Sequence, residues 1–370
     1  MIIKNNYNEC LTNLACSIRK YFGLDYHHKT LKDIDNLLDK NQPKNVVLVL
    51  LDGMGSNILN RTLDENSFLR KNKVKNITSV FPATTTAATT SIRTGLNPIE
   101  HGWLGWNTYL KPIDQTITLF LGVKKETGEK SLEFIENQDL LQVSTIAQDI
   151  NNYNKGGAIE LFPFPTGDAI VYDSLSEFKT RILDETKKEG KRFIYAYNDE
   201  PDHTMHEKGP DSIEAKNLIR ERNDFVEDLY NNLTNTLLIV VADHGHIKVD
   251  NLFLKDYPNI KNMLERVTSS EPRAIALKVK DEYKDVFPEE FNKEFGKYFT
   301  LYSKDEVIES GLYGEGKMHQ VFIDALGDYI AIADKSNKTI LDAGDEELVS
   351  QHAGYTDDEI YVPLIIKLKK

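Results

Sequence analysis

Long runs of apolar residues, each closed by polar positions, recur along the chain. The run NVVLVLLDG at 45–53 is apolar at almost every position before its closing Asp-Gly pair, which is typical of a strand buried on both faces. Similar runs occupy 192–199, 236–245 and 362–368, and helical patterns lie between them at 131–151, 174–189 and 211–232. Buried strands that alternate with helices predict an α/β fold with a mostly parallel central sheet and helices on both faces.

Two further regions follow different patterns. Residues 9–40 predict two amphipathic helices separated by the break GLDYHHKT. Residues 255–345 carry strand patterns that alternate or end in charge, with helical patterns between them, which favours a small α+β cap insertion. We therefore expect a core formed by 1–254 and 346–370, in which 1–43 is a helical N-terminal extension, and a cap formed by 255–345.

The composition of the chain disfavours two classes of function, nucleic-acid binding and insertion into a membrane. The chain of 370 residues has 45 Lys+Arg against 58 Asp+Glu, a net charge of −13, and such an acidic surface disfavours nucleic-acid binding. The sequence shows no signal-peptide pattern and no run of 18 apolar residues, so we expect no membrane span and a cytoplasmic location. Its two cysteines, six positions apart, do not indicate a disulfide framework.

Acidic and imidazole side chains follow the predicted strands. Ligands of open α/β sheets bind beyond the carboxyl ends of the strands, so these side chains are candidates for one shared site. Each is ordinary by itself, because Asp-Gly often forms a turn and a lone histidine is usually structural. Together they offer the carboxylate and imidazole groups that zinc prefers. The candidates are Asp52, Asp202, His206, Asp243, His244 and His352.

The stretch FPATTTAATTSIRTG at 81–95 has five threonines between Thr84 and Thr90. It predicts a helix that begins shortly after the Phe-Pro pair, where one hydroxyl would cap free backbone N–H groups. A helix N-terminus also binds anions, and a hydroxyl held there beside a metal would become a nucleophile. The local pattern does not choose among Thr84, Thr85 and Thr86.

In order and spacing, these segments resemble the type I phosphodiesterase/nucleotide pyrophosphatase family of the alkaline phosphatase superfamily. The resemblance extends from about residue 45 to the C-terminus, and it rests on motifs that are weak singly and specific as an ordered set. The motifs are VLLDG, FPATT followed by SIRTG, HGWLG, EPDHTMHEKGP, VADHG and HAGYTDDEIYVPLI.

The resemblance implies an alkaline-phosphatase-like fold and a site for two divalent metal ions, zinc or manganese. Matched residue by residue, one ion would be held by Asp202, His206 and His352. The other would be held by Asp52, Thr85, Asp243 and His244. Thr85 occupies the nucleophile position, so a phospho-threonine intermediate is implied, with backbone N–H groups near Thr86 holding a phosphoryl oxygen. His246 is expected at most to contact a ligand.

Two positions depart from the nucleotide-cleaving members of this family. Ala88 replaces an Asn that binds a phosphate oxygen, and Thr86 replaces an aromatic residue beside the nucleophile. Tyr197 matches a tyrosine that stacks on the base in that family, whereas an aromatic residue in a buried strand is more often part of the core. Asn107 is a candidate replacement for the missing amide.

The sequence therefore predicts a hydrolase of phosphoric esters that acts on a small phosphate ester or a nucleotide-like substrate, with diesters favoured. Phosphomonoesters and phosphonates are alternative substrates for the same site. A phosphotransferase and a non-catalytic metal-binding module are two further candidate functions. The cap is expected to select the leaving group, and its segment 310–320 is expected to close over the site.

Overall fold

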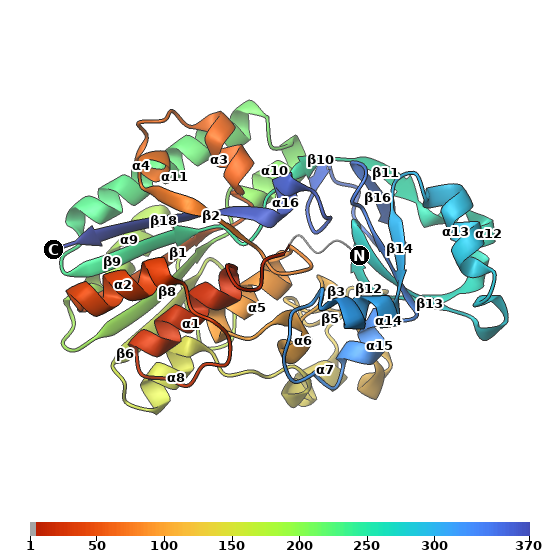
Figure 1. The fold of residues 1–370 in the computed structure, drawn as a ribbon, viewed down its shortest axis with the longest axis horizontal. Helices are drawn as coiled ribbons and strands as arrows, with labels where there is room; N and C mark the ends of the chain where they lie inside the picture. Colours follow the sequence, from red (N-terminus) through yellow and green to blue (C-terminus); the bar gives the residue numbers. More distant parts are fainter. Residues whose placement is uncertain (1–4) are drawn as a thin grey trace.

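The computed structural model describes residues 5–370, so residues 1–4 of the predicted N-terminal extension lie outside it. Two seven-stranded sheets lie side by side, the first on the left and the second on the right of Figure 1. The first sheet has the strand order β2-β18-β9-β1-β8-β6-β7. In that order its strands are Lys73–Thr78, Tyr361–Lys369, Thr236–Val241, Asn45–Leu51, Arg192–Asn198, Gly157–Phe162 and Ile170–Val171.

The centre of the first sheet is parallel, whereas β18 is reversed. Strand β1 pairs in parallel with β8 and β9, and β6 pairs in parallel with β8 and β7. Strand β18 is antiparallel to both β9 and β2, which corrects the expectation that the run at 362–368 belongs to the parallel set. The reversal follows from the path of the chain, because α16 (Asp357–Ile360) enters β18 from the edge at which β1 and β9 end.

Helices cover both faces of this sheet. Figure 1 shows α3, α4 and α11 above the strands and α1, α2, α5 and α8 below them. Their bounds are Ser56–Thr62, Phe68–Lys71 and Ile213–Asn232 for the first group, and Leu11–Tyr21, Lys32–Asn41, Thr85–Thr94 and Ile146–Asn152 for the second. Helix α9 (Leu175–Lys187) packs against α11 and β8. The two helices expected within 9–40 are therefore α1 and α2.

The helix expected over 131–151 is wrong as a single element. The chain instead forms α7 (Leu132–Glu136), a 3-10 turn (Gln138–Leu140) and α8. A new helix begins because Thr145 accepts a hydrogen bond from the Gln148 N–H, while the Gln148 side chain accepts from the Thr145 N–H.

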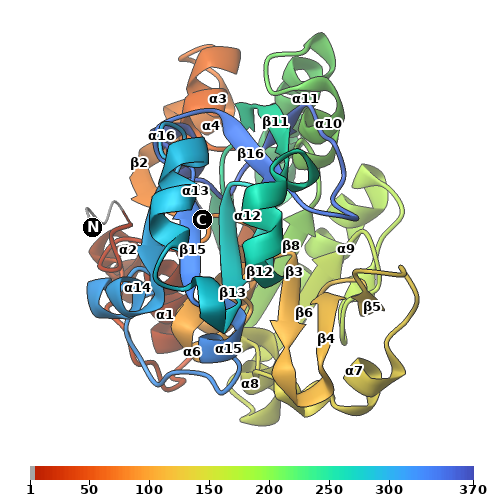
Figure 2. The ribbon, with the colours of Figure 1, turned by 90° about the vertical axis from the view of Figure 1, so that its right-hand side faces the viewer.

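The second sheet has the strand order β14-β15-β13-β12-β3-β4-β5 and is antiparallel throughout. In that order its strands are Thr300–Ser303, Tyr329–Ile332, Ala274–Val279, Leu264–Glu271, Asn107–Leu110, Gln115–Thr118 and Val123–Lys124. Helices α12 (Pro258–Met263) and α13 (Phe287–Phe295) pack with it around four buried phenylalanines, and α14 (Lys304–Ser310) and α15 (Phe322–Leu326) also contact it. Figure 2 shows this sheet facing the viewer.

The boundaries predicted at 255 and 345 are not those of the second sheet. Strands β3, β4 and β5 come from residues 107–124, far earlier in the chain, and β3 pairs with β12. Two small pairings connect the regions near the site, β10 (Ile247–Lys248) with β17 (Ser350–Gln351) and β11 (Asp250–Phe253) with β16 (Lys338–Leu341). Within residues 5–370, no helix is long and apolar enough to cross a membrane.

Candidate metal centre

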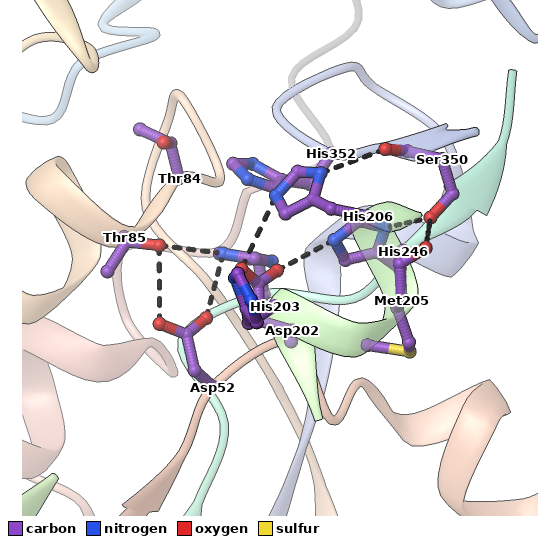
Figure 3. A network of polar contacts seen from close by, with 12 residues as sticks. Asp52, Thr84, Thr85, Asp202, His203, Met205, His206, His246, Ser350 and His352 are labelled. Atoms are coloured by element: carbon purple, nitrogen blue, oxygen red, sulfur yellow. Dashed lines mark hydrogen bonds and ion pairs between the residues drawn. The ribbon is translucent and has the colours of Figure 1, made fainter. Parts of the chain in front are cut away.

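Five segments place polar side chains at the carboxyl ends of β1, β8 and β9. Asp52 directly follows β1, and Asp243 and His244 follow β9. Asp202 and His206 lie one helical turn apart on α10 (Asp202–Lys208), just after β8. Thr85 begins α5, and His352 follows β17. Figure 3 shows Asp52, Thr85, Asp202, His206 and His352 in one region, and Asp243 and His244 lie close to Asp52.

Asp52, Asp243 and His244 form the first cluster. All three are buried, and each offers a ligand atom within 4.8 Å of the others. Thr85 Oγ1 lies beside this cluster, 3.4 Å from Asp52 Oδ2 and 3.2 Å from His244 Nε2. The backbone allows this packing because Gly245 has no Cβ, which would lie 1.9 Å from the Asp358 carbonyl oxygen.

The second cluster contains Asp202, His206, His246 and His352, again with ligand atoms within 4.8 Å of one another. His206 Nε2 lies 3.3 Å from Asp202 Oδ2, and His246 Nε2 lies 2.7 Å from Asp202 Oδ1. His246 therefore belongs to the cluster more closely than the sequence indicated. The only local signal was its place in the motif His-Gly-His.

Backbone carbonyls orient two of these imidazoles. His206 Nδ1 lies 2.9 Å from the Ser350 carbonyl oxygen, and His352 Nδ1 lies 3.2 Å from that of Ala83. A proton on each Nδ1 satisfies these carbonyls and leaves the Nε2 lone pairs free for a metal. The second cluster thus presents the donor type that zinc takes from histidine.

Two buried carboxylate oxygens in the first cluster accept no hydrogen bond within the described structure, Asp52 Oδ1 and Asp243 Oδ2. The second oxygen of each group is satisfied, since Asp52 Oδ2 accepts from Thr85 and Asp243 Oδ1 accepts from the Gly53 N–H. Burial, and then the neighbouring carboxylate, raises the pKa of both side chains well above the usual range. A cation beside these oxygens would offset this cost, so the residues fit a bound metal ion.

The second cluster is also shaped by its charges. Burial alone would raise the pKa of Asp202, but His206 and His246 outweigh it and hold that pKa well below its usual range. Burial opposes protonation of His206, yet Asp202 raises its pKa to about 9. Burial lowers the pKa of His246 to about 4 and that of His352 well below the ordinary value. In this cluster Asp202 is therefore ionised, and His246 and His352 are neutral near pH 7.

The structure gives different surroundings to the three threonines that the local sequence pattern did not distinguish, and of which the resemblance indicated Thr85. Only Thr85 brings its hydroxyl to the first cluster. Thr84 is the N-cap of α5 and donates instead to Glu271 Oε1 at 2.7 Å. Within the described structure the buried Thr86 hydroxyl has no hydrogen-bond partner, and the substrate contact predicted for Thr86 is that of its backbone N–H. That N–H lies in the first turn of the helix, where backbone N–H groups lack intrahelical partners, and its contact with a phosphoryl oxygen stays a prediction.

Tyr197 corrects another expectation. Its ring is buried and stacks on Phe162 with centroids 4.9 Å apart, so it is not positioned to stack on a base. Its hydroxyl donates a short hydrogen bond to Asp52 Oδ2. Tyr197 therefore supports a candidate ligand from beneath the site.

We expect Tyr197→Phe to weaken metal binding by about tenfold or more, because contacts that orient a ligand commonly contribute that much. The variant should leave the ratio of kcat/KM between nucleotide and non-nucleotide diesters unchanged. Calorimetric metal titration and diester assays measure the two quantities. Tyr195→Phe is the matched control, since Tyr195 lies on the same strand and its buried hydroxyl has no described partner. A selective loss of nucleotide turnover in Tyr197→Phe would restore the base-stacking role.

A cavity of about 440 Å³ opens beside Thr85, Asp202, His206 and His352. The second sheet supplies part of its wall through Asn107, Thr118 and Glu271, so Asn107 lies where substrate could reach it. Asn107 Oδ1 accepts from the Thr118 hydroxyl at 2.6 Å, which leaves Nδ2 as its donor. Glu271 was not predicted, because nothing in its local sequence marks it.

The segment expected to close over the site lies elsewhere. Residues 310–320 pack on α6 (Pro98–His101), with the Ile99 N–H donating to the Tyr313 carbonyl, and none of them lines the cavity. Residues of the later loop line it instead, among them Gly344, Asp345, Glu346 and Leu348.

The family model of type I phosphodiesterase/nucleotide pyrophosphatase matches residues 46–356, which spans every residue of both clusters. The chain belongs to this family. Its members are metal-dependent hydrolases of phosphoric esters, so the resemblance and the enzyme class predicted from the sequence are confirmed. No curated protein matches the chain.

Solved structures of this superfamily share the fold. Murine ectonucleotide pyrophosphatase/phosphodiesterase 5, an inactive variant in complex with AMP, is 21% identical with a TM-score of 0.65, covering 86% of this chain and 87% of its own. The human counterpart is 18% identical with a TM-score of 0.63, covering 87% of each chain. Phosphonoacetate hydrolase from Sinorhizobium meliloti, bound to phosphonoacetate, is 15% identical with a TM-score of 0.64, covering 88% of this chain and 90% of its own.

Proposed function

We propose that this family member is a metal-dependent phosphodiesterase in which Thr85 is the nucleophile. The observation that carries the proposal is the position of Thr85 Oγ1. It lies at the start of α5, 3.4 Å from Asp52 Oδ2 and 3.2 Å from His244 Nε2, in the wall of the cavity. A hydroxyl at a helix N-terminus beside acidic ligands is suited to attack a bound phosphoryl group.

Two divalent ions, zinc or manganese, would be held by the two clusters. Asp52, Thr85, Asp243 and His244 would hold one, and Asp202, His206 and His352 the other. We assign His246 to orient Asp202, because its Nε2 lies 2.7 Å from Asp202 Oδ1 and its Nδ1 lies 2.9 Å from the Ser350 hydroxyl. When bound, such ions supply positive charge to the attacking and leaving oxygens of a phosphoryl transfer.

The chain's own residues carry the covalent steps. Thr85 passes its proton to Asp52 Oδ2, to which it donates in the resting state, and its Oγ1 attacks phosphorus while the bond between phosphorus and the departing ester oxygen breaks. The product is phospho-Thr85 and a free alcohol, which takes up a proton. Water then attacks phosphorus, the bond to Thr85 Oγ1 breaks, and the hydroxyl regains a proton. The N–H of Thr86, in the first turn of α5, is placed to hold a phosphoryl oxygen.

The charges of the cavity favour diesters over phosphonates that carry a second anionic group. Such a substrate needs a cation away from the metal clusters. Among the cavity's described lining residues outside the two clusters, Lys125 is the only lysine or arginine, and it is paired with Asp345 at 2.7 Å. Both side chains of this pair are less than a tenth exposed, so the lysine charge is already compensated.

The first test compares bis-p-nitrophenyl phosphate with p-nitrophenyl phosphate under matched conditions. We expect kcat/KM to be higher for the diester, and we expect dialysis against a chelator to abolish turnover of both. Zinc or manganese should restore it. A strong preference for the monoester would contradict the diesterase proposal, and full activity after verified metal removal would contradict metal dependence.

The cytoplasmic location stays a prediction, as does the role of the second sheet in selecting the leaving group. That role is supported by the residues that β3, β4 and β12 contribute to the cavity wall, namely Asn107, Thr118 and Glu271.

A further inference from the structure

Glu271 is a buried carboxyl group in the cavity wall that the proposed chemistry does not use. Its side chain ends β12 and is 3% exposed. Its Oε1 accepts two hydrogen bonds, from the Thr84 hydroxyl at 2.7 Å and from the Trp106 N–H at 2.6 Å. Within the described structure no hydrogen bond ends on Oε2, although Glu271 lines the cavity. One carboxylate oxygen is therefore held by the protein and the other is left for a ligand.

Burying the ionised carboxylate costs free energy as long as Oε2 has no hydrogen-bond partner. Burial raises the pKa of Glu271 to about 7, because the charged form is poorly solvated there. A donor from the substrate would complete the solvation of the carboxylate. The two existing bonds already fix the orientation of the group, so little ordering would be needed on binding.

The rest of the cavity wall outside the two metal clusters is acidic. Among the described residues of this wall, the acidic members are Glu207, Glu271, Asp345 and Glu346, and the basic member is Lys125. Lys125 is paired with Asp345, and Glu207 is paired with Lys208 at 3.7 Å, so the negative charges without an ion pair in the described structure are those of Glu271 and Glu346. Such a wall disfavours an anionic substituent on the substrate and favours a cationic one.

The residue whose backbone N–H binds this carboxylate is a tryptophan that lines the same cavity. This residue, Trp106, has 38% of its surface exposed. A carboxylate and an accessible indole in one cavity form a combination that recognises a protonated amine, through a charge-assisted hydrogen bond and attraction to the ring.

We propose that Glu271 and Trp106 form a subsite for a protonated amine on the alcohol portion of a phosphodiester. The inference rests on the proposed function and names the class of substrate for that site. The ammonium donates to Glu271 Oε2 while its alkyl chain contacts the indole. Glu271 is thus a specificity-determining residue rather than a participant in the bond changes.

The test uses two substrates of similar size that release the same chromophore, p-nitrophenyl 2-aminoethyl phosphate and p-nitrophenyl propyl phosphate. We expect the metal-loaded enzyme to prefer the amine by about tenfold in kcat/KM, which corresponds to about 1.4 kcal/mol. Glu271→Gln should reduce this ratio to about one, because it removes the charge and keeps a carbonyl oxygen for the Trp106 N–H. A purely structural role for Glu271 would lower both rates and leave the ratio unchanged.

Two further variants sharpen the result. Glu265→Gln removes the same charge from the same strand at an exposed position, and it should keep the wild-type ratio. Trp106→Leu retains the backbone N–H that binds Glu271 and removes the ring, so it should lower the ratio even if Glu271→Gln does not fold. A wild-type ratio near one, or a ratio that survives in Glu271→Gln, would overturn the inference. Failure to hydrolyse any diester, including bis-p-nitrophenyl phosphate, would instead overturn the proposed function.

Discussion

Thr85→Ala is expected to lower kcat/KM for bis-p-nitrophenyl phosphate by about three orders of magnitude or more. Loss of a nucleophile that forms a covalent intermediate removes the whole reaction path, and comparable losses in other enzymes are of this size or larger. Thr85→Ser retains a hydroxyl at the same position and should keep measurable turnover. Stopped assays with metal-loaded enzyme, together with metal analysis of each variant, measure the effect.

Thr90→Ala is the matched control for this experiment. Thr90 lies on the same helix with the same 7% exposure as Thr85, but its hydroxyl donates to the Thr86 carbonyl. We expect near wild-type activity from it. Turnover that persists in Thr85→Ala with both metals bound would contradict the assignment of the nucleophile, and equal losses in both variants would indicate a general effect on α5.

Arg273→Met is expected to lower the free energy of unfolding by about 3–5 kcal/mol, because it leaves a buried carboxylate without its partner. Arg273 donates to Glu359 through Nε at 2.6 Å and through Nη2 at 3.0 Å, and both side chains are fully buried. Glu359 also accepts from the Gly354 N–H at 2.7 Å. The pair therefore joins the turn after Glu271 to the loop that carries His352.

The unfolding free energy is measured by urea denaturation of the metal-free protein, and metal affinity is measured separately. We expect metal binding to weaken as well, because the loop of His352 loses its anchor. Arg266→Met is the control, since Arg266 forms exposed pairs with Glu265 and Asp114 that contribute less than about 1 kcal/mol. Similar losses in the two variants would show that burial of the Arg273 pair is not the cause.

Much of the first sheet was predictable from local patterns. The runs at 45–53, 192–199 and 236–245 are apolar because β1, β8 and β9 are buried on both faces. Burial of this kind can be predicted from the residue types of each run alone. The direction of β18 was not predictable, because its run of apolar residues is the same whichever way the strand enters the sheet. The membership of residues 107–124 in the second sheet also depends on pairing across about 160 positions of sequence, between β3 and β12.

The candidate site divides in the same way. Asp52, Asp243 and His244 follow strands whose ends meet at one edge, so their convergence follows from the order of the elements. The sequence alone thus determined the family, the parallel centre of the first sheet and the set of candidate ligands, because strand burial and strand-end chemistry are local properties.

The motif register indicated Thr85 in advance, but only the tertiary structure showed its hydroxyl beside Asp52 and His244, with Tyr197 beneath the site, His246 beside Asp202 and Glu271 in the cavity wall. These placements depend on which side chains meet across distant segments. Glu271, for example, reaches Thr84 over 187 positions of sequence. The substrate-facing part of the site is built from such long-range contacts. These contacts cannot be predicted from the neighbouring residues in the chain, because they impose no pattern on the local sequence.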